Sequence, residues 1–395
     1  MDCYQNNLDY LLLASTMANV AMVVTNACDP DPRVINSAMW LCEAGHHVTI
    51  HAYDRQHTAE LESVIDGVII KRYQLGKSPY GGMLKTAIGI RKFHQHVLSN
   101  LLQSPPNIVV CHDADTLAVG CKLKKIRGAT LILDMHDLQH TWVLMPSPRS
   151  KYRKIISKIM KNRFLRRLPQ TDLIFTSSGT IKNGTFPGLK EWLMSQGFES
   201  TVIENRPVEY SEFAVPTNTN WVVSHIGRIR DINSIRLLFS AIKQMPENQR
   251  PDICIAGDGP SWEQVKLEIE NFSKSIGLNY EISGSYDRNG LAKILQKTNV
   301  MYAMYDPLRG NIHDGALPVK MFDAAAHQVP SVVNSDCLMG ELCEQEQLGK
   351  SVEWDNSSML SEALLSLRDS RVSMDKTALD FKDLYIEEFN KLLLD

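Results

Sequence analysis

The chain has 395 residues, of which 44% are hydrophobic and 22% are charged, and its formal net charge is −3. This length and composition are typical of a globular protein with two domains of roughly 200 residues each. The small acidic excess argues against a general nucleic-acid binder, which normally carries a net basic domain. The eight cysteines include no C-x-x-C pair, so we expect reduced thiols and a cytoplasmic location rather than disulfides or a zinc site.

The first elements predict a βαβ unit. Residues 10–24 are apolar but too short for a membrane span and have no basic leader, so we expect neither a signal peptide nor a transmembrane helix. Residues 19–25 are apolar throughout, as is typical of a strand in a parallel sheet. A helix over 33–44 and a strand over 47–53 follow. No G-x-G-x-x-G follows the first strand, which disfavours a dinucleotide-dependent oxidoreductase.

Strands and helices alternate through the rest of the first half. The predicted strands are 67–73, 107–111, 130–133 and 173–176, and the predicted helices are 84–102 and 116–127. This pattern predicts an α/β fold in which the carboxyl ends of the strands are candidate ligand contacts. Asp113-Ala114-Asp115 has the D-x-D form of some metal sites, but it directly precedes a helix that is predicted to start at Thr116.

His136 is the strongest functional candidate in this half. It lies in LDMHDL (133–138), just past the carboxyl end of a predicted strand. A single histidine is usually structural, but its place at a sheet edge favours a functional role.

The segment 147–169 is strongly basic. It contains nine lysines or arginines and no acidic residue, while apolar residues recur at helical spacing. These features predict a basic amphipathic helix. Two interpretations stay open, a solvated charged face and peripheral contact with an anionic membrane.

A second set of strands and helices begins after a strand at 201–204 and a hinge at 205–207. Strand 221–226 is followed by GRIRDINS, which contains Arg228 and Arg230. Strand 252–256 ends in a turn with Gly259, and small residues there let a ligand approach the backbone.

The stretch 306–334 carries most of the remaining chemistry. After the apolar strand 300–306, a turn rich in Gly, Asn and Asp leads to Pro318 and a predicted helix over 319–327. The first turn of that helix, with Lys320, is expected to bind an anion, and Asp323 lies one turn further along. Residues 329–333 then form another strand.

Three motifs resemble the GT-B glycosyltransferases, in particular glycosyltransferase family 4. LPVKMFDAAAHQVPSVV is similar to the family's LPNKLFEYMAAGLPVI, HDADTLAVG to its HDADTLPVG, and LDMHDL to its YDAHEL. The second resemblance implies that Asp113 and Asp115 cap the helix from Thr116 and line the pocket. The family carries two glutamates separated by seven positions. The second matches Asp323, and the first falls on Gly315, beside which Asp314 is a candidate substitute.

The resemblance implies two Rossmann-like domains facing across a cleft. These would be an acceptor domain at 1–205, a donor domain at 206–375 and a last helix at 376–395 that crosses back onto the first domain. It also implies a retaining, metal-independent transfer from a UDP- or GDP-sugar to a glycan, lipid-linked or small-molecule acceptor.

The resemblance further implies roles for individual residues. His136 and Arg228 would be catalytic, and no metal site or other cofactor is expected. The implied donor contacts are Arg228, Arg230, Gly259, Ser285, Asp314, Gly315, Leu317, Lys320 and Asp323.

Two alternatives accompany this hypothesis. The altered carboxylate pair favours a homologue that binds nucleotide or glycan without turnover, and a nucleotide-sugar epimerase of similar fold is the other. Donor conversion with no acceptor present distinguishes an epimerase from a transferase.

Overall fold

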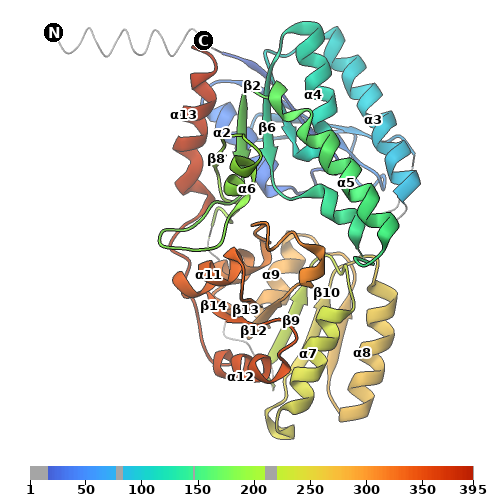
Figure 1. The fold of residues 1–395 in the computed structure, drawn as a ribbon, viewed down its shortest axis with the longest axis vertical. Helices are drawn as coiled ribbons and strands as arrows, with labels where there is room; N and C mark the ends of the chain where they lie inside the picture. Colours follow the sequence, from blue (N-terminus) through green and yellow to red (C-terminus); the bar gives the residue numbers. More distant parts are fainter. Residues whose placement is uncertain (1–16, 77–82, 146, 210–219, 395) are drawn as a thin grey trace, which may run out of the picture. The chain divides into compact units, whose positions relative to one another are not determined.

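The computed structural model describes residues 17–76, 83–145, 147–209 and 220–394. The chain divides into two compact units. The first contains the residues up to His136, Arg163–Phe175 and the chain from Asp380 onward. The second contains Asp137–Asn162 and Thr176–Leu379. Each unit is built on a mainly parallel sheet flanked by helices (Figure 1).

The first unit has a sheet that reverses its strand order near the middle. Its strands are β1 (Asn19–Val24), β2 (His47–Tyr53), β3 (Glu62–Ile65), β4 (Val68–Tyr73), β5 (Ile108–His112), β6 (Thr130–Met135) and β7 (Leu173–Thr176). They follow the order β3-β4-β2-β1-β5-β6-β7, and only the edge pair β3 and β4 is antiparallel among those with a recorded register. The reversal between β1 and β5 is the kind of switch point at which α/β sheets bind ligands.

Helices cover this sheet. They are α2 (Pro32–Glu43), α3 (Met83–Gln103), α4 (Asp113–Arg127) and α13 (Lys382–Lys391), and α5 (Lys151–Leu165) runs from the second unit into the first. Figure 1 shows α3 and α4 side by side. The buried Tyr385 of α13 stacks on Phe175, with ring centroids 4.5 Å apart, and therefore fixes the last helix to the first unit.

Two predicted helix starts were wrong. Helix α4 begins at Asp113, so Asp113 and Asp115 lie in its first turn and do not cap a helix that starts at Thr116. Their side chains instead accept hydrogen bonds from the His136 amide and the Thr25 hydroxyl. The last helix was predicted from residue 376, but α13 begins at Lys382, since a 3-10 turn precedes it.

The second unit has an entirely parallel sheet. Its strands are β9 (Val222–Ile226), β10 (Asp252–Ala256), β11 (Tyr280–Ser283), β12 (Val300–Ala303), β13 (Ser331–Asn334) and β14 (Gly349–Val352). They follow the order β11-β10-β9-β12-β13-β14, which reverses between β9 and β12. The residues of the two-residue strand β8 (Thr201–Val202) are grouped with this unit, but the strand itself is the last strand of the first sheet, next to β7.

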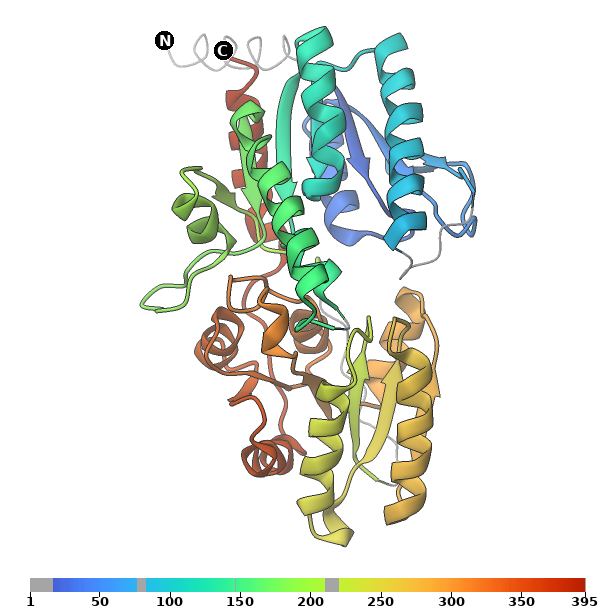
Figure 2. The same cartoon turned by 45° about the vertical axis from the view of Figure 1, so that its right-hand side comes forward.

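Both faces of the second sheet are covered. The helices of this unit are α6 (Leu189–Ser195), α7 (Asn233–Gln244), α8 (Trp262–Ile276), α9 (Arg288–Gln296), α10 (Lys320–Ala326), α11 (Leu338–Gln345) and α12 (Ser357–Leu367). Helices α7, α8 and α12 contribute to one hydrophobic core, and α9, α10 and α11 to another. Figure 2 shows α7 and α8 side by side. Because both faces are covered, the inner strands β9, β10 and β12 are buried at almost every position.

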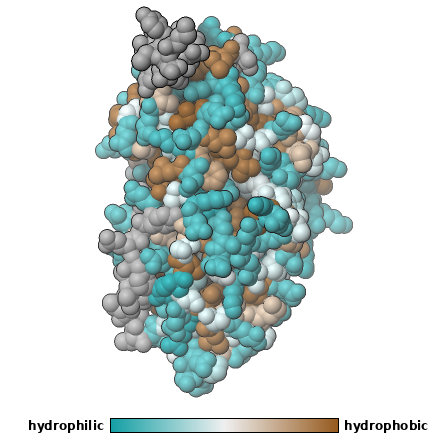
Figure 3. All heavy atoms as spheres, turned by 90° about the vertical axis from the view of Figure 1, so that its left-hand side faces the viewer, coloured by the Kyte–Doolittle hydropathy of each residue, from teal (hydrophilic) through white to brown (hydrophobic). Residues whose placement is uncertain are grey.

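The described residues contain no helix that is long and apolar enough to cross a membrane. On the face drawn in Figure 3, hydrophilic and hydrophobic residues are intermixed and form no continuous apolar band. The seven cysteines in the described ranges are free thiols. Residues 10–16 of the apolar stretch near the start, together with Cys3, lie outside the described residues.

Candidate functional site

A pocket lies at the carboxyl edge of the second sheet, where the strand order reverses. Loops after β9 and β12 and the start of α10 contribute to its wall, which is lined by Met145, His225, Arg228, Arg230, Asp231, Ser234, Met304, Tyr305, Asp306, Arg309 and Lys320. Four of these side chains are arginine or lysine. Three predicted donor contacts, Arg228, Arg230 and Lys320, therefore meet in one place.

Glycines allow the loops after β9 and β10 to run against each other. A Cβ atom on Gly257 would lie 1.9 Å from the Gly227 carbonyl oxygen, and one on Gly259 would lie 2.1 Å from the Ile229 carbonyl oxygen. Both glycines also have positive φ angles. Gly259 thus allows a close backbone approach, but its neighbour is the β9 loop and it does not line the pocket.

Arg228 is oriented by Asp258 in the loop after β10. The Arg228 Nη1 donates to Asp258 Oδ1 at 2.7 Å, and the Ser285 hydroxyl donates to Asp258 Oδ2 at 3.2 Å. Asp258 therefore links Arg228 to Ser285, which lies beside the pocket wall rather than in it.

Arg230 and Lys320 are cations in a poorly hydrated place. The Arg230 guanidinium lies over the Trp142 ring, 5.2 Å from its centroid, and burial lowers its pKa to about 10. Lys320 Nζ lies 3.4 Å from His225 Nε2 and 5.0 Å from the Tyr305 ring centroid, and burial lowers its pKa to about 7. An anion that entered the pocket would compensate for this loss of hydration.

Asp323 lies on the helix that Lys320 begins. Helix α10 starts at Lys320, one residue later than predicted. Burial raises the Asp323 pKa to about 7. Burial is also the main cause of the raised pKa of the nearby Tyr286 phenol, and the charge of Asp323 raises it further. Asp323 does not line the pocket, so a role in binding requires a ligand that extends toward Tyr286.

The structure explains why Gly315 has no side chain. Gly315 has a φ of +91°, and a Cβ atom there would lie 2.4 Å from the Gly188 Cα atom. The Ser178 hydroxyl donates to the Gly315 carbonyl at 2.6 Å and fixes the crossing. A carboxylate therefore cannot occupy this position without displacement of the backbone at 187–188.

Asp314 and Leu317 do not line the pocket. The Asp314 carboxyl group is partly buried, and this burial raises its pKa, while Lys161 and His313 act in the opposite direction. Leu317 is buried in the core that contains α10. Asp314 therefore does not place a carboxylate in the pocket in place of Gly315.

Sequence reasoning missed Arg309. Arg309 Nη2 donates to Asp137 Oδ2 at 2.7 Å, and Trp142 Nε1 donates to the same oxygen at 2.7 Å. Burial alone would raise the Asp137 pKa, but Arg309 and these hydrogen bonds hold it below its usual value. Its position in the turn after β12 could have indicated this arginine, but only the Gly, Asn and Asp residues of that turn were considered.

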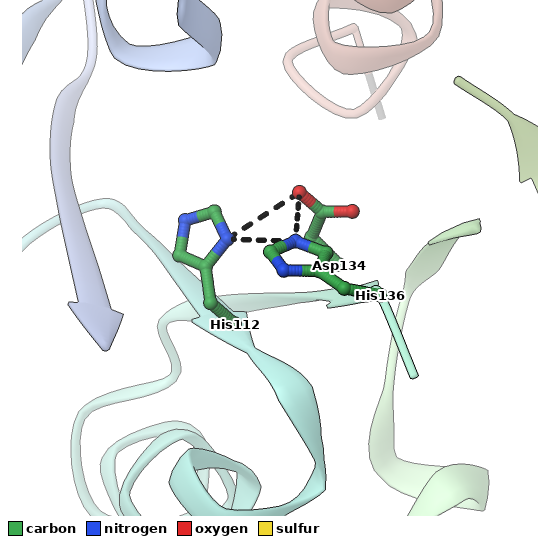
Figure 4. Close-up of side chains that lie close together, drawn as sticks. All are labelled: His112, Asp134 and His136. Carbon is green, nitrogen blue, oxygen red and sulfur yellow. Dashed lines mark hydrogen bonds and ion pairs between the residues drawn. The ribbon is translucent and has the colours of Figure 1, made fainter. Parts of the chain in front are cut away.

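His136 lies in a separate cluster at the switch point of the first sheet. Figure 4 shows His112, Asp134 and His136 pointing toward one another from the ends of β5 and β6. Asp134 Oδ2 lies 3.3 Å from His112 Nδ1 and 3.1 Å from His136 Nε2, and the two ring nitrogens are 3.4 Å apart. Arg33 donates to both oxygens of the same carboxylate.

The charges of this cluster depend on one another. Burial opposes charge on Asp134 and His136, but Arg33 and His136 hold the Asp134 pKa well below its usual value. Asp134 and Asp113 in turn raise the His136 pKa, while burial lowers that of His112. We infer an ionised Asp134 between two cations, Arg33 and His136, with a neutral His112.

The same three side chains have the donor set of a metal site. Their ligand atoms lie within 4.8 Å of one another, and two histidines with a carboxylate can bind zinc or iron. However, the Arg33 guanidinium already donates to both oxygens of this carboxylate, which reduces the charge and the lone pairs that it could offer to a metal ion. The arrangement therefore fits a hydrogen-bonded cluster better than a metal site.

Comparisons with known proteins agree with the fold. Residues 220–370 match the family model described as Glycosyl transferases group 1. A sucrose-phosphate synthase from Thermosynechococcus elongatus superposes with a TM-score of 0.68 at 13% identity, over 94% of this chain and 99% of that one. The catalytic domain of starch synthase IV from Arabidopsis thaliana, bound to ADP and acarbose, has a TM-score of 0.65 at 12% identity, over 96% and 100% of the two chains.

A third structure extends the comparison. Anabaena HepE in complex with UDP-glucose has a TM-score of 0.59 at 13% identity, over 95% of this chain and 100% of that one. No curated protein sequence matches the chain. Residues 220–370 therefore match a glycosyl transferases group 1 domain, within a chain that has the GT-B fold of these glycosyltransferase structures.

Proposed function

We propose that the protein transfers a sugar from a nucleoside diphosphate, as a UDP- or GDP-sugar, to a glycan, lipid-linked or small-molecule acceptor, with retention and without a metal. The observation that carries the proposal is that Arg228, Arg230 and Lys320 line one pocket within the matched segment. Transfer leaves negative charge on the departing diphosphate, and preorganised cations stabilise such charge. The HepE complex with UDP-glucose supports this choice of donor class.

The other predicted contacts have complementary roles in the proposal. Asp323 binds the ribose hydroxyls, and Ser285, oriented through Asp258, lies toward the base. Donor residues then all fall within 206–375, the proposed donor domain, and His136 within 1–205, the proposed acceptor domain.

His136 acts on the sugar in this proposal. The raised pKa of its ring favours the protonated form, which donates hydrogen bonds to sugar oxygens. We expect His136→Ala to lower turnover about a hundredfold or more while nucleotide affinity changes little, as for a contact made in the transition state. Wild-type turnover in this variant would assign His136 to structure.

Thermal-shift screening tests the donor class. UDP, GDP and ADP and their sugars are added separately, because a ligand at about 100 times its dissociation constant stabilises the folded protein by roughly 2.7 kcal/mol. NMR of the product then gives the anomeric configuration. The donor assignment fails if no nucleotide shifts the melting temperature, and retention fails if the product is inverted.

Gly315 favours one other candidate function, binding without turnover. Its contact with Gly188 excludes the first carboxylate of the family's pair. A protein of this kind would bind nucleoside diphosphate sugars but would neither transfer nor hydrolyse them. Donor consumption measured at saturating donor separates the two functions.

Helix α5 supports peripheral contact with an anionic membrane through segment 147–169. Tyr152 and Ile155 are 66% and 60% exposed, and Ile159 and Met160 are exposed beside them on a helix without acidic residues. Apolar residues bordered by lysines are typical of helices that bind at the lipid interface. The proposal requires sedimentation with anionic but not neutral vesicles, and release by salt, because charge attraction is screened beyond about 10 Å at 0.1 M.

A further inference from the structure

Unpartnered polar atoms gather in the turn after β12. Tyr305 Oη, Arg309 Nε and Asn311 Oδ1 are all buried and have no hydrogen-bond partner among the described residues. Most buried polar atoms in proteins are paired, because an unpaired one has lost its hydrogen bonds to water without a replacement. Since Tyr305 and Arg309 also line the cation-rich pocket, the turn has the properties of a site whose hydrogen-bonding partner is a ligand.

The backbone of this turn is held firmly. Asn334 at the end of β13 accepts from the Tyr305 amide at 2.8 Å and donates to the Tyr305 carbonyl at 3.0 Å. Asp306 accepts from the Leu308 amide at 2.9 Å and from Asn233 Nδ2 at 3.0 Å. The unpartnered groups therefore belong to an ordered segment and not to a loose loop.

Arg309 is held on one side only. Its Nη2 is bound by Asp137, whose oxygen also accepts from Trp142 Nε1. A guanidinium group has five N–H donors in a planar fork, so the contact with Asp137 fixes its plane and leaves other donors for an anion. Lys320 Nζ lies over the Tyr305 ring at 5.0 Å, which brings Tyr305 close to another cation of the pocket.

We propose that Tyr305 and Arg309 form a second phosphate-binding element, which binds the diphosphate of the donor together with Arg228, Arg230 and Lys320. This inference rests on the proposed function and adds two binding residues to it. Arg309 donates two parallel hydrogen bonds to phosphate oxygens, and the Tyr305 hydroxyl donates one. Asp137 and Trp142 are positioning residues, because they act on the ligand only through Arg309.

Calorimetric titration of the full chain with inorganic pyrophosphate and with orthophosphate tests the proposal. We expect Arg309→Gln to weaken pyrophosphate binding about tenfold to a hundredfold and Tyr305→Phe about threefold to tenfold. Orthophosphate, which cannot span both groups of cations, should lose less. Arg236→Gln is the matched control, since Arg236 lies outside this pocket and pairs with Glu268 on the surface, and we expect it to change binding less than twofold.

Two further measurements keep the test decisive if Arg309→Gln folds poorly. Arg309→Lys keeps the charge but loses the planar fork, so it should still weaken pyrophosphate binding severalfold. Added guanidinium chloride at low millimolar concentration should restore part of the affinity of Arg309→Gln, which a purely structural arginine would not show.

The outcomes separate this inference from the proposed function. Arg309→Gln and Tyr305→Phe could bind pyrophosphate as the wild type does while Arg228→Gln does not. In that case Tyr305 and Arg309 do not bind phosphate, and the proposed donor pocket is kept. If the wild type itself binds neither pyrophosphate nor any nucleoside diphosphate, the proposed function fails first.

Discussion

The two switch points of this molecule use charge in opposite ways. In the first unit, one buried carboxylate, Asp134, is surrounded by Arg33, His112 and His136. In the second unit, four cationic side chains line a pocket. The turn after β12, which forms part of the pocket wall, contains buried polar atoms without a hydrogen-bond partner among the described residues. Both places lie at the carboxyl edge of a sheet where the strand order reverses.

The difference indicates what each place can do. The Asp134 cluster balances its own charges, so it fixes the direction and the protonation of His136 without a ligand. The pocket is balanced only in part, so it gains most when an anion enters. The first arrangement suits orientation of a reacting group, and the second suits binding of a charged one.

The largest expected effect tests whether the charged side chains around Asp134 stabilise one another without a ligand. Asp134→Asn leaves the Arg33 guanidinium buried without its counter-charge, which should lower the free energy of unfolding by about 3–5 kcal/mol. Glu263→Gln, which removes an exposed partner of Lys266, should cost less than about 1 kcal/mol. Urea denaturation at pH 7 measures both, and equal stabilities would show that the cluster is not an interdependent unit.

The next effect tests whether the second unit can accept the family's missing carboxylate. Gly315→Glu should lower stability by about 2–4 kcal/mol, because a side chain there meets Gly188 and the φ angle is positive. Gly310→Ala is the matched control, since Gly310 has a similar φ of +87° but no atom within 4 Å of a Cβ position. Its cost should be only about 1 kcal/mol. If both variants unfold at the same urea concentration, the Gly188 contact is not what excludes the carboxylate.

A smaller effect tests how far the binding region extends beyond the pocket wall. Asp323→Asn should weaken nucleoside diphosphate binding about tenfold to a hundredfold, through lost hydrogen bonds to the ribose, and leave pyrophosphate binding nearly unchanged. Because the Asp323 pKa is about 7, the carboxylate forms as pH rises, and the difference between the two proteins should grow from pH 6 to 8. Calorimetry with both ligands measures this, and a parallel loss for the two would assign Asp323 to structure.

The smallest effect is a pH dependence of the pocket itself. The lowered pKa of Lys320, about 7, means that its positive charge is lost as pH rises through neutrality. Pyrophosphate affinity should therefore fall up to about tenfold from pH 6 to 8, relative to Lys320→Met measured in parallel. The parallel variant corrects for the ionisation of pyrophosphate. Identical profiles would remove Lys320 from the anion site.

Most helices and strands could be predicted from the sequence, because both sheets are mainly parallel and are covered by helices. Segments rich in apolar residues marked β2, β7 and β10 at their observed bounds. The short edge strand β3 was missed, since three of its four residues are exposed and it carries no such run. The start of α4 was misplaced by three residues, since Asp113 and Asp115 were expected before the helix and instead lie in its first turn.

The site was predictable where single residues follow a strand. Arg228 and Arg230 come directly after β9, so the sequence alone brought them to the edge of the sheet. No sequence pattern distinguishes Arg309 from other arginines as a site residue. Its role depends on contacts with Asp137 and Trp142, which lie more than 160 residues away along the chain. The exclusion of a side chain at Gly315 likewise depends on a crossing with 187–188 that only tertiary structure creates.

That crossing has a consequence for the evolution of this chain. Gly188 itself allows no side chain, since a Cβ atom there would lie 2.4 Å from the Gly179 Cα atom. Gly179 and Gly188 from one segment and Gly315 from a distant one therefore contact one another in series. A substitution at one of them is tolerated only after the backbone at another has moved. A glutamate at position 315 therefore requires a shift of the backbone at 187–188, which a single substitution at 315 does not supply.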